Sequence, residues 1–305
     1  MDLSIILVNY KSPQLVLNCV QSIYEQTKEI TFEILLVDNA SGDNSKEIIL
    51  TKYPQIKWIQ LDYNAGFARG NNAAIKVAKG ELILLLNTDT IVLDNALEKA
   101  LALYRNEIDI AACGVQLLNT DGSNQISGAH FVKGGLNLLL PLPYLGSFIR
   151  YWGYRLNTKV PGITSIKDKI EVDWIVGAFI LTSKTIIKKA GMLDEDFFMY
   201  AEEIEWCSRL KNQGGMYLFS DPKVIHIGGG TSGDFYDIEN SENNSDLWSP
   251  KGRQILLSNL VRIRKQYGIL TYLMHNLILL VEIIIFLIGL PINKLFKLKK
   301  YKWGN

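Results

Sequence analysis

One carboxylate follows a short, wholly apolar run, and this combination gives the first indication of chemistry. Residues 82–86 read Leu-Ile-Leu-Leu-Leu, and the polar residues Asn87, Thr88, Asp89 and Thr90 come directly after them. Such a run predicts a buried parallel strand, and open α/β sheets bind ligands at the carboxyl ends of these strands. Asp89 offers the hard oxygen ligand that Mg²⁺ or Mn²⁺ prefers, so we expect a cation there that also takes diphosphate oxygens.

A glycine-containing loop precedes this run. Gly66 and Gly70 bracket Phe67, Ala68 and Arg69. Glycine permits a positive φ or a close approach of the backbone to a ligand. Arg69, at the predicted start of a helix, can meet a base or a phosphate. The loop therefore suits a nucleotide, although a glycine loop alone is not specific.

Asp38 and His226 each end a predicted strand. Asp38 can accept hydrogen bonds from a base or a ribose hydroxyl, but Asp followed by Asn is equally ordinary in a turn. His226 stands before Gly228, Gly229 and Gly230, a loop that can close over a diphosphate. The imidazole there can donate to phosphate or bind a metal, and a purely structural histidine is the alternative.

Three carboxylates crowd the start of a predicted helix at residues 202–211. They are Glu202, Glu203 and Glu205, and the aromatic run 197–200 precedes them. Acids in a first helical turn are favoured by the helix dipole, which is the structural explanation. Crowded carboxylates also raise one another's pKa values, which suits a general base.

The elements that must position these groups alternate between strand and helix. Strands are predicted at 5–8, 34–37, 56–61, 82–86 and 110–115, and Ser12 with Pro13 marks the start of the first helix. Regular pattern returns at 172–181, in a helix from Ser183, and in strands at 216–219 and 224–227. This order predicts βαβ units and a mostly parallel α/β sheet. Residues 120–170 are irregular, either as a packed subdomain or as an acceptor- or membrane-facing surface.

Composition excludes several classes of protein. The net charge is +1, which gives no drive toward nucleic acid. Cys19, Cys113 and Cys207 are widely spaced, so free thiols in a reducing cytosol are expected, and no signal peptide is evident. Asn9, Tyr10 and the residues after them replace the GxGxxG that a dinucleotide-dependent oxidoreductase would carry there. A non-catalytic sugar-binding or scaffold protein remains an alternative.

Taken together, the motifs resemble glycosyltransferase family 2, and within it the rhamnosyltransferase-like branch. The resemblance covers about residues 3–232, and the order and spacing of its blocks make it specific. The blocks are residues 4–10, 37–41, 64–72 and 86–90, then Val172, Asp173 and Trp174 with Gly177 and Ala178, then 197–209, and finally His226. No QxxRW motif, which a processive synthase of this fold usually carries, is present.

The resemblance implies a GT-A fold and a set of roles. Asn9, Asp38 and Arg69 would lie at the nucleoside, and Asn64, Gly66 and Asn87 would complete the donor site. Asp89 would bind Mg²⁺ or Mn²⁺ together with His226, although Asn87 stands where the metal motif often has its first Asp. Glu203 would be the general base, with Glu202 in reserve, because the family's Glu-Asp pair is Glu202-Glu203 here. Trp174, Gly177 and Ala178 would bind the acceptor.

The reaction implied is a single in-line displacement with inversion at the anomeric carbon. The branch favours dTDP-rhamnose as donor, with UDP- or GDP-linked sugars as alternatives. A saccharide acceptor, lipid-linked in cell-surface polysaccharide synthesis, would agree with the tail of the chain. The sequence does not indicate the linkage or the oligomeric state.

Three regions are expected: a nucleotide-sugar half at 1–118, an acceptor and base half at 119–235, and a helical extension at 236–305. Residues 269–290 are almost continuously apolar, long enough to span a bilayer. Thr271, His275 and Glu282 fall on one helical face, and lysines follow from Lys294. A helix in the membrane interface or a hairpin anchor is expected, on the cytoplasmic face of the cell membrane. The alternatives are a single crossing, which would move the lysines across the membrane, and a helix that packs on the domain or in a dimer.

Overall fold

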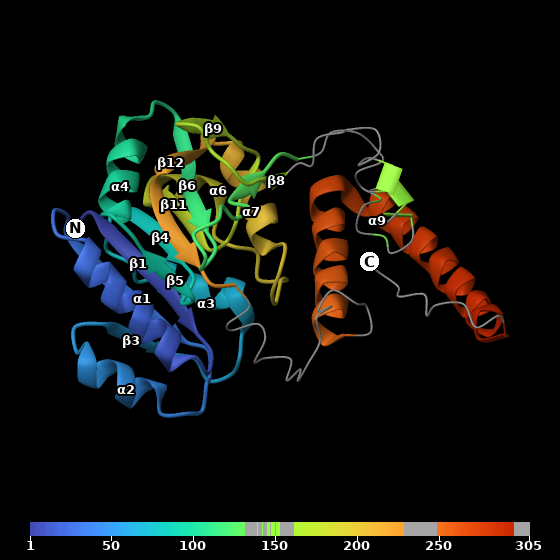
Figure 1. Ribbon diagram of the computed structural model, residues 1–305, viewed down its shortest axis with the longest axis horizontal. Helices are drawn as coiled ribbons and strands as arrows, with labels where there is room; N and C mark the ends of the chain where they lie inside the picture. Colours follow the sequence, from blue (N-terminus) through green and yellow to red (C-terminus); the bar gives the residue numbers. More distant parts are fainter. Residues whose placement is uncertain are drawn as a thin grey trace. The chain divides into compact units, whose positions relative to one another are not determined.

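The computed structural model describes residues 1–131, 162–228 and 249–295, and residues 139, 142, 145–146, 148–149 and 151–152 between the first two ranges. The chain divides into two compact units (Figure 1). The first comprises Met1–Phe131 and Gly162–Asp237, and the second comprises Val132–Pro161 and Ile238–Asn305. The glycine loop after residue 228, the proline-containing run at 141–143 and the lysines beyond residue 295 lie outside the described residues or at their edges.

A nine-stranded mixed sheet organises the first unit, in the order β3-β2-β1-β4-β11-β6-β12-β5, with β9 also paired to β12. A small sheet of order β10-β7-β8 accompanies it. The strands are β1 (Leu3–Asn9), β2 (Phe32–Asp38), β3 (Lys57–Gln60), β4 (Leu82–Leu86), β5 (Thr90–Val92), β6 (Ile110–Leu118), β7 (Gly128–Ala129), β8 (Gly162–Ile163), β9 (Lys169–Glu171), β10 (Trp174–Ile175), β11 (Phe179–Ser183) and β12 (Gly215–His226).

Helices cover both faces of the large sheet, so each strand alternates its side chains between two cores. Leu7 of β1 packs in the core with α1 (Pro13–Gln26), α2 (Ser45–Lys52) and α4 (Ala96–Asn106). Ile6, its neighbour, packs in the core with α3 (Gly66–Ile75), α6 (Lys184–Ala190) and α7 (Glu202–Lys211). Both side chains are fully buried, and each such burial contributes roughly 1.5–3 kcal/mol. A sheet covered twice explains why its strands read as uninterrupted apolar runs.

The strand directions bring the ends of five segments to one edge of the sheet. β1, β2 and β4 are parallel, so Asn9, Asp38 and Asn87 lie at the same edge. β11 runs antiparallel to β4, so its start, after Ala178, lies there too. β6 runs antiparallel to β11, and β12 runs parallel to β6, which brings His226 to this edge as well. The antiparallel insertion of β11 makes the sheet mixed.

The strands predicted at 216–219 and 224–227 form one strand in the structure, β12. Its pairing with β6 shifts between Phe219 and Lys223, where three residues have no partner in the register. This irregularity contains Asp221 and Pro222 and interrupts the apolar alternation, which is why the sequence pattern divides there.

In the second unit, α9 (Pro250–Leu295) consists of two helical segments that meet at Gly268, whose φ is +84°. Its part from Pro250 to Ile285 is long and apolar enough to cross a membrane, with a mean hydropathy of 1.9 over its most apolar window, of which 11% is buried. His275 and Glu282 are buried, whereas the leucines around them are exposed: Leu270, Leu273, Leu277, Leu280 and Leu287. The polar face of α9 is therefore buried and its apolar face is exposed. A helix that packs on the core of a water-soluble protein has the opposite arrangement.

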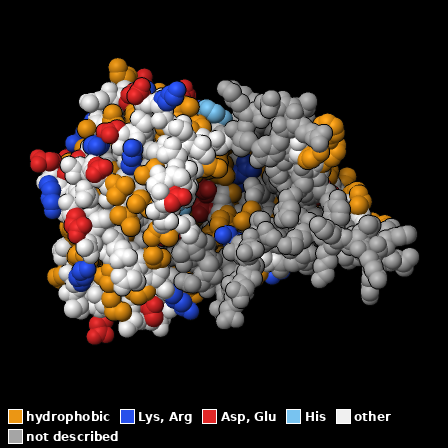
Figure 2. Space-filling model, in the orientation of Figure 1, with side chains coloured by type: hydrophobic (Ala, Val, Ile, Leu, Met, Phe, Trp, Pro, Cys, Tyr) orange, Lys and Arg blue, Asp and Glu red, His pale blue; other side chains and the backbone are white. Residues whose placement is uncertain are grey.

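Charged side chains of both signs are interspersed on the described surface visible in Figure 2. This distribution agrees with the net charge of +1. All three cysteines are buried and free, as expected. Burial raises the pKa of the Cys19 and Cys207 thiols to about 12, so neither is a reactive thiolate at neutral pH.

Candidate functional site

Asn9 and Asp38 meet side by side at the ends of β1 and β2. They are register partners, and Asn9 Nδ2 donates to Asp38 Oδ1 at 2.8 Å. Asp38 also accepts from the Ser41 hydroxyl and backbone amide and from Gln60 Nε2 at 2.9 Å. Its carboxylate thus accepts four hydrogen bonds, so a base or ribose would have to replace one of them. Gln60, the longest of these side chains, is the natural one to displace.

Asn39, which the sequence indicates only as a turn residue, joins this corner to the glycine loop. Its Nδ2 donates to Asn64 Oδ1 at 2.8 Å, and its Oδ1 accepts from the Ala65 amide at 2.8 Å. Asn64 Oδ1 accepts in turn from the Gly66 amide at 3.1 Å. The first residues of the loop are therefore fixed by the Asn39 and Asn64 side chains.

Gly66 touches the segment that precedes α7. Its φ is +81°, and a β-carbon on it would stand 2.1 Å from the carbonyl oxygen of Phe198. The Phe67 amide donates to that same carbonyl at 2.8 Å. The glycine loop is thus in direct contact with the aromatic segment that leads into the acidic helix. Only glycine fits at this contact.

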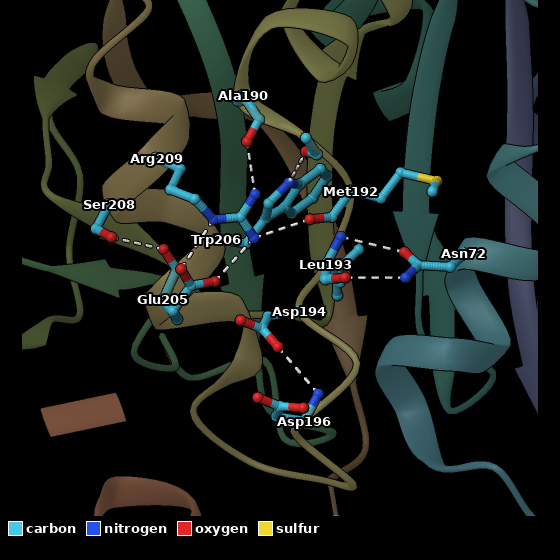
Figure 3. Close-up of polar contacts among 11 residues, drawn as sticks. Asn72, Ala190, Met192, Leu193, Asp194, Asp196, Glu205, Trp206, Ser208 and Arg209 are labelled. Carbon is cyan, nitrogen blue, oxygen red and sulfur yellow. Dashed lines mark hydrogen bonds and ion pairs between the residues drawn. The ribbon is translucent and has the colours of Figure 1, made fainter. Parts of the chain in front are cut away.

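Arg69 lies one helical turn further along α3 and is partly exposed. Its Nε is 3.7 Å from Glu195 Oε2, and this ion pair is the contact that the structure gives it. Asn72, also on α3, makes a reciprocal pair with the backbone of Leu193, donating at 2.9 Å and accepting at 3.1 Å (Figure 3). Asn72 ends one of the blocks of the family resemblance without a predicted role, and the structure shows it anchoring the 190–200 segment.

Asp89, in the turn after β4, lies close to His226 at the end of β12. Asp89 is buried, and its Oδ1 is 3.5 Å from His226 Nε2. The Ile227 amide donates to the Asp89 carbonyl at 2.9 Å, which holds the two strand ends together. Asn87 Nδ2 is also 3.5 Å from His226 Nε2, and its backbone amide donates to the Ala178 carbonyl at 3.1 Å.

This donor set fits a divalent cation that is shared with a substrate. A carboxylate oxygen and an imidazole nitrogen are both ordinary ligands of Mn²⁺, and Mg²⁺ is commonly held by one or two carboxylates plus substrate phosphates. Among the described residues, no third His, Cys, Asp or Glu joins Asp89 and His226. The remaining positions would be filled by diphosphate oxygens and water.

Glu202 and Glu203 begin α7, and their surroundings differ. Glu202 is buried, and its Oε2 has no hydrogen-bond partner among the described residues. Burial first, and the charge of Glu203 second, hold the pKa of Glu202 well above its usual range. Glu203 is partly exposed and lies beside Gly177, where a β-carbon would be 3.7 Å from Glu203 Cβ and Cγ. The pair therefore contains one buried acid whose neutral form is favoured, Glu202, and one acid that is partly exposed, Glu203.

Glu205 has a structural task that its neighbours do not share. Its two oxygens accept from Arg209 Nε and Nη2, both at 2.8 Å. Arg209 also donates to the carbonyls of Ala190 and Met192, at 2.6 and 2.8 Å (Figure 3). The bidentate pair lies within α7 and orients the Arg209 guanidinium, whose two donations to backbone carbonyls tie α7 to the segment that precedes it.

Of the predicted acceptor residues, Trp174 begins β10, and Gly177 and Ala178 lie between β10 and β11. Gly177 faces Glu203 and Phe67, and Ala178 is buried against Asn87 through the amide contact above. Trp174 is half-buried and pairs with Ala129 of β7. The structure thus brings Gly177 to the acids, while Trp174 stands in the small sheet beside them.

Residues 4–170 match the family described as Glycosyl transferase family 2. The chain belongs to that family. The matched region ends before α7 and β12, so Glu203 and His226 of this family 2 chain lie outside it.

Relatives of this family 2 chain include the "Low-salt glycan biosynthesis hexosyltransferase Agl10" of Haloferax volcanii, 28% identical over 70% of this chain and 62% of the relative. The "dTDP-rhamnosyl transferase RfbF" of Shigella flexneri is 23% identical over 68% of this chain and 64% of its own. The chain thus spans less than two thirds of the length of these curated relatives. Only the second of these two names specifies rhamnose, so the comparisons show the family and not the rhamnosyltransferase branch.

Solved structures establish the GT-A fold that the resemblance implied. S. aureus TarS 1-349 in complex with UDP-GlcNAc is similar with a TM-score of 0.53 at 17% identity, over 87% of this chain and 73% of that one. GalNAc-T7 with UDP, GalNAc and Mn²⁺ is similar with a TM-score of 0.55 at 14% identity, over 74% of this chain and 44% of that one.

Proposed function

We propose that this chain transfers a sugar from a nucleoside diphosphate donor to a hydroxyl of a saccharide acceptor, with inversion at the anomeric carbon. The proposal rests on two groups of side chains that lie at the same edge of the sheet: a pair that suits a cation and a carboxyl group that suits a base. Asp89 with His226 offers a cation and diphosphate site, and Glu203 beside Gly177 offers a base. A departing diphosphate and an attacking hydroxyl need these two groups on opposite sides of a sugar.

In this proposal Glu203 takes the proton of the acceptor hydroxyl as that oxygen attacks the anomeric carbon. Burial favours the neutral form of Glu202, so we assign the role of base to the more accessible Glu203. Proton transfer to a well-placed base contributes roughly 10²–10⁴-fold to a rate. A divalent cation at Asp89 and His226 would offset the charge that develops on the leaving diphosphate.

The donor we infer is dTDP-rhamnose. Two relatives whose names specify rhamnosyl transfer support it, RfbF at 23% identity and an N-acetylglucosaminyl-diphospho-decaprenol L-rhamnosyltransferase of Mycobacterium tuberculosis at 22%. UDP- and GDP-sugars are the alternatives, and the UDP-GlcNAc bound to TarS favours the first of these. The acceptor we infer is a lipid-linked saccharide in the synthesis of a cell-surface polysaccharide.

The second unit supports an acceptor at a membrane, because its polar groups have partners inside the unit. Glu282 Oε1 accepts from the Leu145 amide at 2.6 Å, and His275 Nδ1 is 3.2 Å from the Thr271 carbonyl. In hydrocarbon, polar groups must be satisfied internally, and here the apolar side chains face outward. We therefore place the exposed leucines of α9 in the apolar layer on the cytoplasmic side of the cell membrane.

Three exposed aromatic residues of the same unit strengthen this assignment. Phe148 and Tyr151 each stack edge-on against Trp152, with ring centroids 6.2 and 6.0 Å from it. All three side chains are exposed. Aromatic side chains concentrate at membrane–water interfaces, where one part of the ring system is apolar and another is wet.

A thermal-shift panel tests the proposed reaction at its first step. The purified chain is melted with dTDP, UDP, GDP or NAD, each with Mn²⁺ and with EDTA. A ligand at a hundred times its dissociation constant stabilises by about 2.7 kcal/mol. Stabilisation by one nucleoside diphosphate that needs Mn²⁺ supports the site and identifies the nucleotide of the donor. No shift with any diphosphate, or a shift with NAD alone, contradicts the proposal.

A further inference from the structure

Gln125 lies against His226 although no motif in the sequence points to it. It follows β6, and its backbone amide donates to the Leu117 carbonyl at 2.8 Å. Its side chain is partly buried and reaches β12, 101 residues away in the sequence, where its Oε1 is 2.7 Å from His226 Nδ1. This contact is shorter than the 3.5 Å that separates His226 Nε2 from Asp89 Oδ1, so the imidazole is held more closely on its Nδ1 side.

The direction of the Gln125 amide is fixed by its other contacts. Gln125 Nε2 is 3.2 Å from the backbone carbonyl of His226 and 3.0 Å from Asn119 Oδ1. A backbone carbonyl can only accept, so the NH₂ group must face it. The amide oxygen of Gln125 is then the atom that faces His226 Nδ1. A flipped amide would set two oxygens against each other.

This direction determines which nitrogen of His226 carries the proton. An amide oxygen only accepts, so Nδ1 must be the protonated nitrogen. In the neutral imidazole the lone pair is then on Nε2, the atom 3.5 Å from Asp89 Oδ1 and 3.5 Å from Asn87 Nδ2. The lone pair thus faces the carboxylate with which it would share a cation.

We propose that Gln125 is a positioning residue for the metal site. It holds His226 in the Nδ1–H tautomer and fixes the orientation of the ring, so that Nε2 stays available as a ligand. This inference rests on the cation site of the proposed function. Hydrogen-bond partners of metal-ligating histidines typically change metal affinity by about 10- to 100-fold when they are removed.

The test compares Gln125→Leu with Gln125→Glu. Leucine removes the acceptor, whereas glutamate keeps an oxygen for Nδ1–H and loses the two N–H donors. The tautomer is read from ¹⁵N chemical shifts of the imidazoles in EDTA, which is tractable because the chain has three histidines. A His226→Gln variant assigns the His226 signals. Mn²⁺ affinity is measured by titration calorimetry in the presence of the nucleoside diphosphate that the thermal panel selects.

We expect wild type to show a protonated Nδ1 on His226, and Gln125→Leu to lose this preference and bind Mn²⁺ about 10- to 100-fold more weakly. Gln125→Glu loses the same N–H contacts to the loop as Gln125→Leu but keeps an acceptor for Nδ1–H, so it should keep the tautomer, whereas a loss of loop structure alone would change the tautomer in both variants. Gln14→Leu, a change of the same kind on α1, controls for the substitution itself.

Three results would overturn the inference, and they differ from one another. An unchanged His226 tautomer in Gln125→Leu removes the positioning role. A changed tautomer with unchanged Mn²⁺ affinity shows that the tautomer does not serve the metal. If the wild-type protein binds the nucleotide equally well without Mn²⁺, the proposed cation site is wrong. This last result would contradict the proposed function and not the contact between Gln125 and His226.

Discussion

The carbonyl oxygen of Phe198 occupies the space that a side chain on Gly66 would need. A β-carbon there would lie 2.1 Å from this oxygen, and the φ of Gly66 is +81°. Phe198 stands four residues before Glu202, in the segment that leads into α7. A side chain at Gly66 would therefore displace the segment that leads to the acids at the start of α7, so this contact joins the proposed donor and acceptor parts of the site.

Gly66→Ala is expected to destabilise the fold and weaken nucleotide binding together. A left-handed backbone costs a non-glycine residue about 1–2 kcal/mol, and the collision with the Phe198 carbonyl adds to it. Gly42→Ala is the matched control, because its φ is +66° and nothing lies within 4 Å of a β-carbon there. Urea unfolding should show a larger decrease in the free energy of unfolding for Gly66→Ala than for Gly42→Ala. Equal losses would show that the Phe198 contact has no consequence.

Glu203→Gln is expected to lower the transfer rate by about 10²–10⁴-fold and to leave nucleotide affinity unchanged. The amide has nearly the shape of the carboxylate but cannot take a proton. Transfer of sugar is measured with the donor chosen by the thermal panel, and affinity by calorimetry. Glu47→Gln, an exposed position in the first turn of α2, should behave as wild type. Full transfer by Glu203→Gln would move the role of base to another acid, with Glu202 first.

Glu202→Gln is expected to change how stability depends on pH. The pKa of Glu202 is raised in the folded chain, so the folded state holds its proton above the unfolded value of about 4.3. The contribution of protonated Glu202 to the free energy of unfolding is therefore fully present below that pH. It is lost as pH rises, by at most about 1.4 kcal/mol per pH unit. A glutamine at position 202 does not titrate, so the variant lacks this pH-dependent decrease in stability.

The measurement is urea unfolding of both proteins between pH 5 and pH 8. The variant should gain stability relative to wild type as pH increases. Parallel curves would mean that Glu202 ionises in the folded chain as it does in the unfolded one, which its buried Oε2 without a partner among the described residues argues against.

Replacing Leu273, Leu277 and Leu280 with glutamine should release the chain from membranes. The three side chains are exposed on α9, so their loss leaves little packing to disturb. At about 1 kcal/mol each, the triple change weakens partition roughly a hundredfold. Flotation with lipid vesicles measures it, and Ile108→Gln, exposed on the first unit, is the control. Undiminished flotation of the triple variant would exclude this face as the membrane contact.

Much of the sheet follows from local pattern. The strand predicted at 82–86 is β4 as observed, and the helix predicted at 202–211 is α7 as observed. Ser12 precedes α1 as predicted, but its hydroxyl contacts Asn9 Oδ1 at 3.2 Å and makes no cap. Burial on both faces leaves a clear apolar signature, whereas the partners of a polar side chain depend on strands that are distant in sequence.

The parts that the sequence could not reveal are long-range contacts. The antiparallel place of β11 between β4 and β6 depends on the whole chain, and no local pattern encodes it. Gln125 and Asn39 look like ordinary loop residues until β12 and the glycine loop are in place. The inward direction of Glu282 needs the Leu145 amide, 137 residues away. The division into halves at residue 118 and the roles of the site residues stay predictions.

The position of β11 also has a consequence for how the chain is made. Among the described strands, β6 pairs with β11 and β12, both of which follow it by more than 60 residues, and β4 has β11 as its second neighbour. A nascent chain that has emerged only to residue 170 therefore exposes an apolar edge on β4 and leaves β6 without either neighbour. Closing such distant pairings is slow, and open strand edges invite association with other chains. Synthesis of this protein thus passes through a stage at which a chaperone has a clear target, and a fragment ending near residue 170 should not fold alone.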